Sequence, residues 1–314
     1  MKDLSLFLST ATLVILLGYI TYKGTTHTEK RDSISDAEVA NDEMEDSLHP
    51  LPAMSLNLPE STSFAGEPVP IEIPDVHERF DKELQINTYL HSNTLFLMKR
   101  ANRWLPQIDS ILKKNGIPED FKYLPIIESA LINDISPKEA VGFWQILKTS
   151  GKELGLEITT EVDERYDPIK STHAACKYLK KAYGKFGNWT LAAASYNRGM
   201  SGLEKAIENQ DVKSYYDLFL NDETSRYVFR ILAIKEIIEH PEKYGFKIKT
   251  EHLYQAENYR PIEVTETIKS LVDFANSHGI NYKLLKRHNP WLREEILTVR
   301  KGKNYFIAIP VYGK

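Results

Sequence analysis

Hydrophobic residues between positions 76 and 114 recur every three or four residues, which is the spacing of one face of an α-helix. Gly116 and Pro118 interrupt this pattern. Asn, Asp, Ser and Pro residues predict a loop over residues 132–141. Further helices are predicted over residues 118–131, 142–154, 167–186, 189–196 and 226–238. Residues 76–250 are therefore expected to form a helical domain.

The C-terminal part of the chain follows a different pattern. Strand-like runs lie at residues 261–265 and 305–310, the second reading YFIAIP. Two short helices are predicted between them, over residues 267–276 and 281–287. The predicted fold class is therefore mainly α, with a small βααβ unit within residues 251–314.

An apolar run without a charged residue extends from Leu4 to Tyr22. At about 1.5 Å per helical residue, its nineteen residues just span a hydrocarbon core about 30 Å thick. No Ala-x-Ala cleavage site follows, and the two tyrosines near its end suit a membrane–water boundary. Residues 1–23 are therefore predicted to be an uncleaved signal anchor. A cleaved signal peptide and a buried soluble helix are the alternatives.

Residues 24–75 are acidic and rich in proline. They hold twelve Asp and Glu residues, two basic residues, six of the fifteen prolines and one aromatic residue, Phe64. Such a segment buries too little apolar surface to offset its chain entropy, so a disordered tether is predicted. The chain has a formal charge of −4 and this segment −10, which leaves residues 76–314 mildly basic. No nucleic-acid partner is predicted from so small an excess.

The composition restricts the chemistry further. The 314 residues are 42% hydrophobic and 27% charged, as in an ordinary globular protein. The single cysteine, Cys176, cannot form an internal disulfide or a cysteine-based metal site. No histidine pair has the helical spacing of metal ligands, and no Gly-rich phosphate loop is present. No cofactor and no metal are therefore predicted.

One carboxylate is a candidate for acid catalysis. Residues 121–129 read FKYLPIIES, an apolar helix with Glu128 near its end and a polar loop beyond it. Burial would raise the pKa of Glu128, and a glutamic acid protonated near neutral pH can donate its proton to a glycosidic oxygen. Position alone favours the alternative, a helical glutamate that faces solvent.

Three ordered motifs resemble the bacterial lytic transglycosylases of the soluble lytic type, and among them the membrane-bound D group. The first is Glu128-Ser129. The second, SPKEAVGFWQ at residues 136–145, matches the family pattern S-P-x-x-A-x-G-x-x-Q. The third, ASYNRG at residues 194–199, matches A-Y-N-x-G. Residues 223–227, ETSRY, also resemble a segment typical of the D group.

The resemblance implies a lysozyme-like catalytic domain within residues 76–250, with its core at 104–246. It implies that peptidoglycan is cleaved without water between N-acetylmuramic acid and N-acetylglucosamine, at the β-1,4 bond, which leaves 1,6-anhydromuramic acid ends. Glu128 would be the single acid and base. Tyr196 would donate a hydrogen bond to Glu128 and position it, and a tyrosine buried in the core is the alternative.

Substrate binding is assigned to further residues on the same resemblance. Ser136 and Gln145 would hold polar groups of the sugar, unless they are ordinary loop and helix residues. Trp144 would stack on a sugar ring, although packing in the core is the preferred interpretation. Ser129 and Asn197 complete the assignment, and local hydrogen bonding is the alternative for both.

Residues 261–310 resemble in outline the LysM modules that bind N-acetylglucosamine chains. Asn289-Pro290 and the YFIAIP strand support this resemblance. The Gly-Asp dipeptide expected between the first strand and the first helix is missing. Glycan binding and a structural cap on the catalytic domain therefore both stay open.

The expected partners are peptidoglycan glycan strands and, through the N-terminal anchor, a membrane; the sequence does not indicate which proteins it binds. The expected location is the bacterial cell envelope, with a periplasmic catalytic domain held by an inner-membrane anchor or released by signal cleavage. A non-catalytic cell-wall scaffold is one alternative function. A goose-type lysozyme, which would use water and recruit Asp134 or Glu139 as its base, is another.

Overall fold

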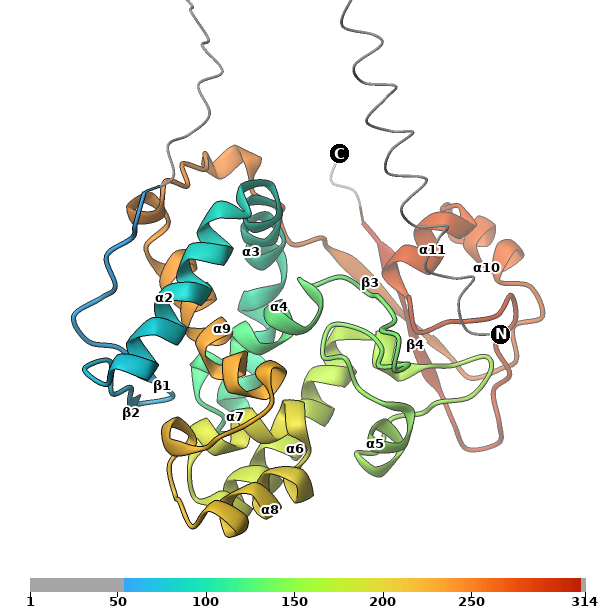
Figure 1. The fold of residues 1–314 in the computed structure, drawn as a ribbon. Helices are drawn as coiled ribbons and strands as arrows, with labels where there is room; N and C mark the ends of the chain where they lie inside the picture. The colour runs from blue at the N-terminus through green and yellow to red at the C-terminus, as the bar shows by residue number, and fades with distance from the viewer. Residues whose placement is uncertain (1–53, 312–314) are drawn as a thin grey trace, which may run out of the picture. The chain divides into compact units, whose positions relative to one another are not determined.

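The computed structural model of the protein describes residues 54–311 (Figure 1). Helices dominate this part of the chain, together with two antiparallel pairs of short strands. The predicted anchor at residues 1–23 and the tether up to residue 53 lie outside the described residues. Within residues 54–311, no helix has both the length and the apolar character that membrane crossing requires.

A small hairpin, β1 (Ser63–Phe64) and β2 (Glu67–Pro68), precedes the first helix. Phe64 is fully buried, and its ring meets that of Phe121 edge-on, with 5.1 Å between the ring centroids. The carboxylate of Glu67 accepts hydrogen bonds from the backbone N–H groups of Trp189 (2.6 Å) and Thr190 (2.9 Å). The predicted tether over residues 24–75 is therefore wrong at its C-terminal end, which packs on the helical domain.

The first periodic stretch forms two helices, α2 (Pro74–Tyr89) and α3 (His91–Lys114), separated at Leu90. Helix α2 begins with a proline in its first turn, where no backbone N–H is needed. It packs along α9 (Asp222–Glu239), as Figure 1 shows. The buried Glu83 of α2 pairs there with Arg226 of α9, with 2.5 Å between Oε1 and Nε.

The predicted helix over residues 118–131 is divided into a 3₁₀ helix, η1 (Glu119–Tyr123), and α4 (Leu124–Ser129). The predicted helix over residues 142–154 is wrong for its first half, because α5 covers only Lys148–Glu153. Residues ahead of α5 form backbone bridges instead, which join Val141 to both Ile135 and Ile146.

A second group of helices completes the domain: η2 (Glu164–Tyr166), α6 (Pro168–Phe186), α7 (Trp189–Arg198), α8 (Met200–Gln210), η3 (Tyr215–Asp217) and α9. Helix α6 starts as predicted, because the side chain of Asp167 accepts the N–H groups of Ile169 and Lys170. It ends as predicted at Gly187, which has a φ of +65°. Small buried residues on α7 let its neighbours approach closely.

Beyond η4 (Pro241–Tyr244) and η5 (Thr250–His252), the chain forms the expected βααβ unit: β3 (Tyr259–Val264), α10 (Leu271–Ser277), α11 (Tyr282–His288) and β4 (Tyr305–Pro310). The two strands are antiparallel, with Tyr259 opposite Pro310 and Val264 opposite Tyr305. The unit has its own hydrophobic core, to which Val162 of the helical domain also belongs. The predicted fold class is confirmed.

Candidate active site

Glu128 lies near the C-terminal end of α4, and the four residues that precede it in this helix are buried. The helix stops because Ala130 and Leu131 have φ values of +51° and +57°, in the left-handed region. The side chain of Glu128 is half-buried. The apolar FKYLPIIES segment thus presents one carboxyl group at the boundary between the core and the following loop.

Two arginines from other helices hold the end of α4. Arg230 of α9 donates to the carbonyl of Ile127, with 2.6 Å between Nη2 and O. Arg100 of α3 donates to the carbonyl of Ala130, with 2.7 Å between Nε and O. Carbonyl groups at a helix end lack helical partners, so these bonds stabilise the end of the helix and fix the backbone on both sides of Glu128.

Burial is the main influence on the acidity of Glu128, and it raises the pKa of the carboxyl group. A hydrogen bond from Tyr227 and the positive charge of Arg230 act in the opposite direction. The negative charge of Glu223 adds to the upward shift. The net result is a raised pKa, so Glu128 keeps its proton at pH values where an exposed glutamate has lost it.

The tyrosine that contacts Glu128 is Tyr227 of α9, whose hydroxyl donates to Oε1 of the carboxyl group. The prediction that Tyr196 makes this bond is wrong, because the hydroxyl of Tyr196 donates to the carbonyl of Trp144 at 2.8 Å. Burial raises the pKa of both phenols, and the charge of Glu128 raises both further. Both tyrosines therefore stay neutral hydrogen-bond donors.

The second motif lies on a loop that we call the motif loop, residues 134–146. Gln145 has a φ of +46°, and its amide nitrogen donates to the carbonyl groups of Gly142 (2.9 Å) and Asp134 (3.2 Å). The hydroxyl of Ser136 accepts a bond from the backbone N–H four residues further on, at 3.1 Å. Both side chains shape the loop from within, and their contact with substrate stays a prediction.

Trp144 is fully buried, and its indole N–H donates to the hydroxyl of Thr172 at 2.8 Å. A sugar ring stacks only on an accessible aromatic face. The preferred interpretation, packing in the core, is therefore confirmed, and the assignment of Trp144 to substrate binding is wrong.

Ser129 and Asn197 bond mainly to the protein itself. The hydroxyl of Ser129 donates to the carbonyl of Phe143 at 2.9 Å, which ties the end of α4 to the motif loop. The amide of Asn197 donates to Glu223 (3.0 Å) and accepts from the hydroxyl of Thr224 (2.7 Å). These bonds agree with the local alternative for both residues, and substrate binding by either stays a prediction.

Three residues next to Glu128 were not predicted: Glu223, Tyr227 and Arg230. All three belong to α9, and Tyr227 lies 99 residues from Glu128 along the chain. The ETSRY segment at residues 223–227 is the only signal in the sequence for Glu223 and Tyr227, and its resemblance to the D group carries no residue role by itself. Arg230 lies outside this segment and has no such signal.

A cavity of about 500 Å³ lies between α3, η1 and the α9–η4 region. Its lining is mainly apolar, and none of the predicted site residues contributes to it. The candidate site is therefore defined by the contacts around Glu128 and not by this cavity.

The structure combines a helical domain, with a half-buried glutamate at the end of a short helix, and a βααβ unit. Two family models match the corresponding parts of the sequence. Residues 107–219 match the transglycosylase SLT domain. Residues 260–313 match the soluble lytic transglycosylase C-terminal LysM-like domain. The chain therefore carries a transglycosylase SLT domain followed by a LysM-like domain, and the resemblance drawn from the three motifs is confirmed.

Three relatives are similar to parts of this chain. The chain is 30% identical over 259 residues to the membrane-bound lytic murein transglycosylase D of Escherichia coli (strain K12), which covers 78% of this chain and 55% of that protein. The protein of the same name from Escherichia coli O6:H1 gives the same values. A putative tributyltin chloride resistance protein of Alteromonas sp. (strain M-1) is 32% identical over 123 residues, 38% of this chain and 59% of that protein. The chain thus spans about half the length of these curated relatives.

Proposed function

We propose that this protein is a peptidoglycan lytic transglycosylase in which Glu128 is the only acid and base. The carboxyl group of Glu128, with a pKa raised by burial and with a tyrosine hydroxyl bonded to it, is the observation that carries the proposal. The SLT domain and the similarity to a murein transglycosylase support the same reaction class.

The first step needs a protonated carboxyl group. Glu128 donates its proton to the oxygen of the β-1,4 bond between N-acetylmuramic acid and N-acetylglucosamine, and the bond from C1 to that oxygen breaks. The acetamido group of the sugar helps to stabilise the positive charge that develops at C1. Because burial raises its pKa, Glu128 is better able to hold the required proton than an ordinary glutamate.

The second step needs the ionised carboxylate. Glu128 accepts the proton of the 6-hydroxyl group of the muramic acid while that oxygen attacks C1, which closes the 1,6-anhydro ring. The hydroxyl of Tyr227 and the charge of Arg230 both favour the ionised form. One side chain therefore serves both steps, and no water is consumed.

The substrate is assigned from the comparisons and from the loops beside Glu128. A relative named for murein supports peptidoglycan as the substrate. Ser136 and Gln145 on the motif loop are the proposed contacts for the polar groups of the sugar. The LysM-like domain is proposed to provide a second contact with the glycan strand.

The proposed location is the cell envelope, with the catalytic domain in the periplasm and residues 1–23 as an inner-membrane anchor. The similarity to a membrane-bound transglycosylase supports the envelope. The mass of the N-terminal peptide of protein extracted from membranes tests the anchor. A chain that starts after about residue 22 would instead indicate a cleaved signal peptide.

The deciding experiment measures the products released from purified peptidoglycan by mass spectrometry. We expect anhydro ends from the full chain. Glu128→Gln should release these products about 10²- to 10⁴-fold more slowly. Glu223→Gln and Glu139→Gln are matched controls that remove other carboxylates and should keep most of the activity. Products heavier by one water would indicate a hydrolase, and an inactive Glu139→Gln would indicate that Glu139 serves as its second carboxylate. Unchanged turnover by Glu128→Gln would refute the assignment.

A further inference from the structure

The LysM-like domain packs against a segment of the SLT domain that we call the bridging segment, residues 156–166. The backbone N–H of Asp163 donates to the carbonyl of Trp291 at 2.9 Å. The backbone N–H of Arg293 donates to the carbonyl of Glu161 at 2.8 Å. Between these bonds, Val162 is 2% exposed and belongs to the hydrophobic core of the LysM-like domain.

Side chains strengthen this connection. The carboxylate of Glu161 accepts bonds from the backbone N–H of Thr298 (2.6 Å) and from its hydroxyl (3.0 Å). The carboxylate of Glu157 pairs with Lys303 and accepts a bond from the hydroxyl of Tyr305 at 3.0 Å. The bridging segment is thus held by backbone, apolar and charged contacts with the C-terminal domain.

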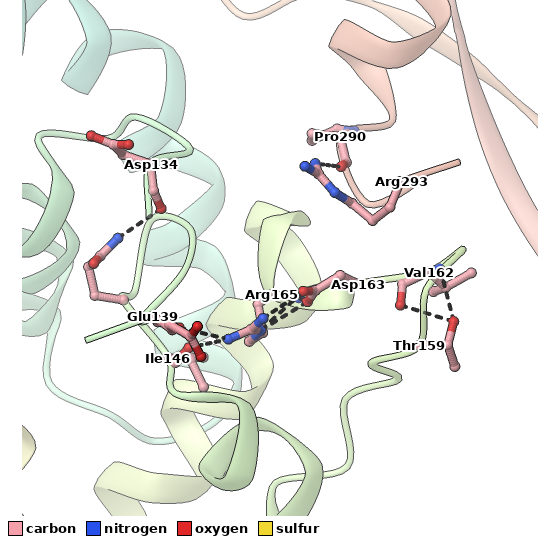
Figure 2. Close-up of polar contacts among 10 residues, drawn as sticks. Asp134, Glu139, Ile146, Thr159, Val162, Asp163, Arg165, Pro290 and Arg293 are labelled. Carbon is pink, nitrogen blue, oxygen red and sulfur yellow. Dashed lines mark hydrogen bonds and ion pairs between the residues drawn. The ribbon is translucent and has the colours of Figure 1, made fainter. Parts of the chain in front are cut away.

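The other side of the bridging segment holds the motif loop through one side chain, Arg165. Figure 2 shows its guanidinium group between Asp163 and the carbonyl groups of Glu139 and Ile146. Nη1 lies 3.1 Å from each of these two carbonyl oxygens, and Nη2 lies 2.7 Å from Oδ2 of Asp163. Arg165 is only 7% exposed, so these bonds are sheltered from water.

The motif loop depends on such outside support because it has little regular structure. Glu139 and Gln145 both have positive φ values, +59° and +46°, which cost conformational energy in residues other than glycine. Gly142 passes so close to the carbonyl oxygen of Arg165 that an added Cβ would lie 2.1 Å from it. The backbone of Arg165 and its side chain therefore both fix the loop that carries Gln145.

We propose that Arg165 is a positioning residue through which the LysM-like domain holds the motif loop in the shape that binds the glycan. The proposal rests on the proposed function, because it assigns substrate contacts to this loop. Asp163 orients the guanidinium group of Arg165, and Trp291 fixes the backbone of Asp163 in turn. The C-terminal domain is then part of the catalytic unit, whether or not it also binds glycan.

The test uses two matched substitutions in the full chain, Asp163→Asn and Asp120→Asn. Both aspartates are buried, with 9% of the side chain exposed, and each pairs with one cation, Arg165 or Lys235. Each also accepts one backbone N–H. Asp120 contacts the N-terminal hairpin and not the motif loop, so its replacement reports the cost of losing a buried ion pair alone.

Asp163→Asn and Arg165→Lys are expected to raise KM for soluble peptidoglycan strands about tenfold, which corresponds to roughly 1.4 kcal/mol of binding free energy. In both variants, kcat should stay within about twofold of the value for the unsubstituted protein. Lysine cannot reproduce the planar fork that reaches two carbonyl groups and a carboxylate. Amide hydrogen exchange should become faster in residues 136–146. Asp120→Asn should lower the melting temperature about as much as Asp163→Asn does. It should leave KM and hydrogen exchange in the motif loop unchanged.

Val162→Ala tests the contribution of the C-terminal domain, since it removes core atoms from that domain without touching Arg165. Exchange in residues 136–146 should rise, although less than in Asp163→Asn. Unchanged loop exchange in Val162→Ala, or a rise in KM shared equally by Asp120→Asn, would overturn the proposal. Exchange needs no turnover, so a chain that makes no anhydro product would refute the proposed function while this coupling could still be measured.

Discussion

Replacing Tyr227 with phenylalanine isolates the hydrogen bond that stabilises the ionised form of Glu128. The phenol of Tyr227 is 1% exposed, and its hydroxyl donates to the carboxyl group from α9. Phenylalanine keeps the ring and its packing and removes only the donor. The change therefore acts on the proton affinity of Glu128 with little effect on the shape of the site.

The size of the effect follows from the kind of bond that is lost. A hydrogen bond to a charged group contributes about 1.5–3 kcal/mol, and 1.36 kcal/mol corresponds to a tenfold change in a protonation equilibrium. At a fixed pH, the ratio of ionised to protonated Glu128 should fall roughly ten- to a hundredfold. The pKa of Glu128, already raised by burial, rises further in Tyr227→Phe.

The pH dependence of anhydro-product release is the appropriate assay. The free enzyme must hold the proton for the first step, so kcat/KM should fall as the pH rises through the pKa of Glu128. In Tyr227→Phe this alkaline limb should move to higher pH. The maximal rate should decrease, because the carboxylate formed in the first step is no longer stabilised by the hydroxyl.

Tyr215→Phe is the matched control. Tyr215 is also 1% exposed, and its hydroxyl lies 2.8 Å from the carbonyl oxygen of Thr224 and 2.6 Å from that of Ser225, away from Glu128. It should destabilise the fold without moving the alkaline limb. An alkaline limb that stays in place in Tyr227→Phe, or moves to lower pH, would refute the electrostatic account of the site.

Two further predictions concern stability. Glu128→Gln should stabilise the fold increasingly as the pH rises above about 4.3, the usual pKa of an unfolded glutamate, because the folded carboxyl group has a raised pKa and resists ionisation. The gain in stability should level off above the pKa of the folded group. A gain that does not depend on pH in thermal unfolding would contradict this. Gly142→Ala should destabilise the protein far more than Gly116→Ala in denaturant unfolding, because the Cβ added at position 142 would lie 2.1 Å from the carbonyl oxygen of Arg165. At Gly116 only the positive φ opposes the substitution, at a cost of about 1–2 kcal/mol. Equal decreases in the free energy of unfolding would show that the motif loop can move aside.

Features that depend on neighbours in the chain were predicted well from the sequence. Asp167 and Gly187 bound α6 because capping involves residues a few positions apart. The βααβ unit was predicted with small errors in its bounds, since the strand alternation in residues 305–310 is local. The local pattern made Glu128 a candidate, but position alone favoured a glutamate that faces solvent, and only the resemblance of the three motifs assigned it to catalysis.

The average composition of residues 24–75 did not predict the hairpin formed by β1 and β2. The acidic, proline-rich character of residues 24–75 indicates disorder for the segment as a whole. A single aromatic residue, Phe64, is nevertheless fully buried, and the carboxylate of Glu67 bonds to the first turn of α7. Both residues have specific partners more than fifty positions away in the chain, which hold the short hairpin against the helical domain, and composition does not register such contacts.

The partners of Glu128 could not be derived from local pattern at all. Tyr196 was expected to contact Glu128 on the strength of a motif, but its hydroxyl reaches a carbonyl of the motif loop. The hydroxyl that does reach Glu128 comes from α9, and its position depends on how α9 packs against α4. A tyrosine in an amphipathic helix looks like any other core residue until that packing is known.

The two halves of the proposed activity are therefore supported by different parts of the chain. In the proposed reaction, proton transfer depends on α4 and α9, where Arg230 and Tyr227 contact the end of α4 and Glu128. The proposed glycan binding depends on the motif loop, which Arg165 connects to the C-terminal domain. A variant on α9 should alter the pH profile and kcat, whereas a variant on the bridging segment should alter KM. If a single substitution at Arg165 changed the pH profile as Tyr227→Phe does, this division would be wrong, and the motif loop would itself set the proton affinity of Glu128.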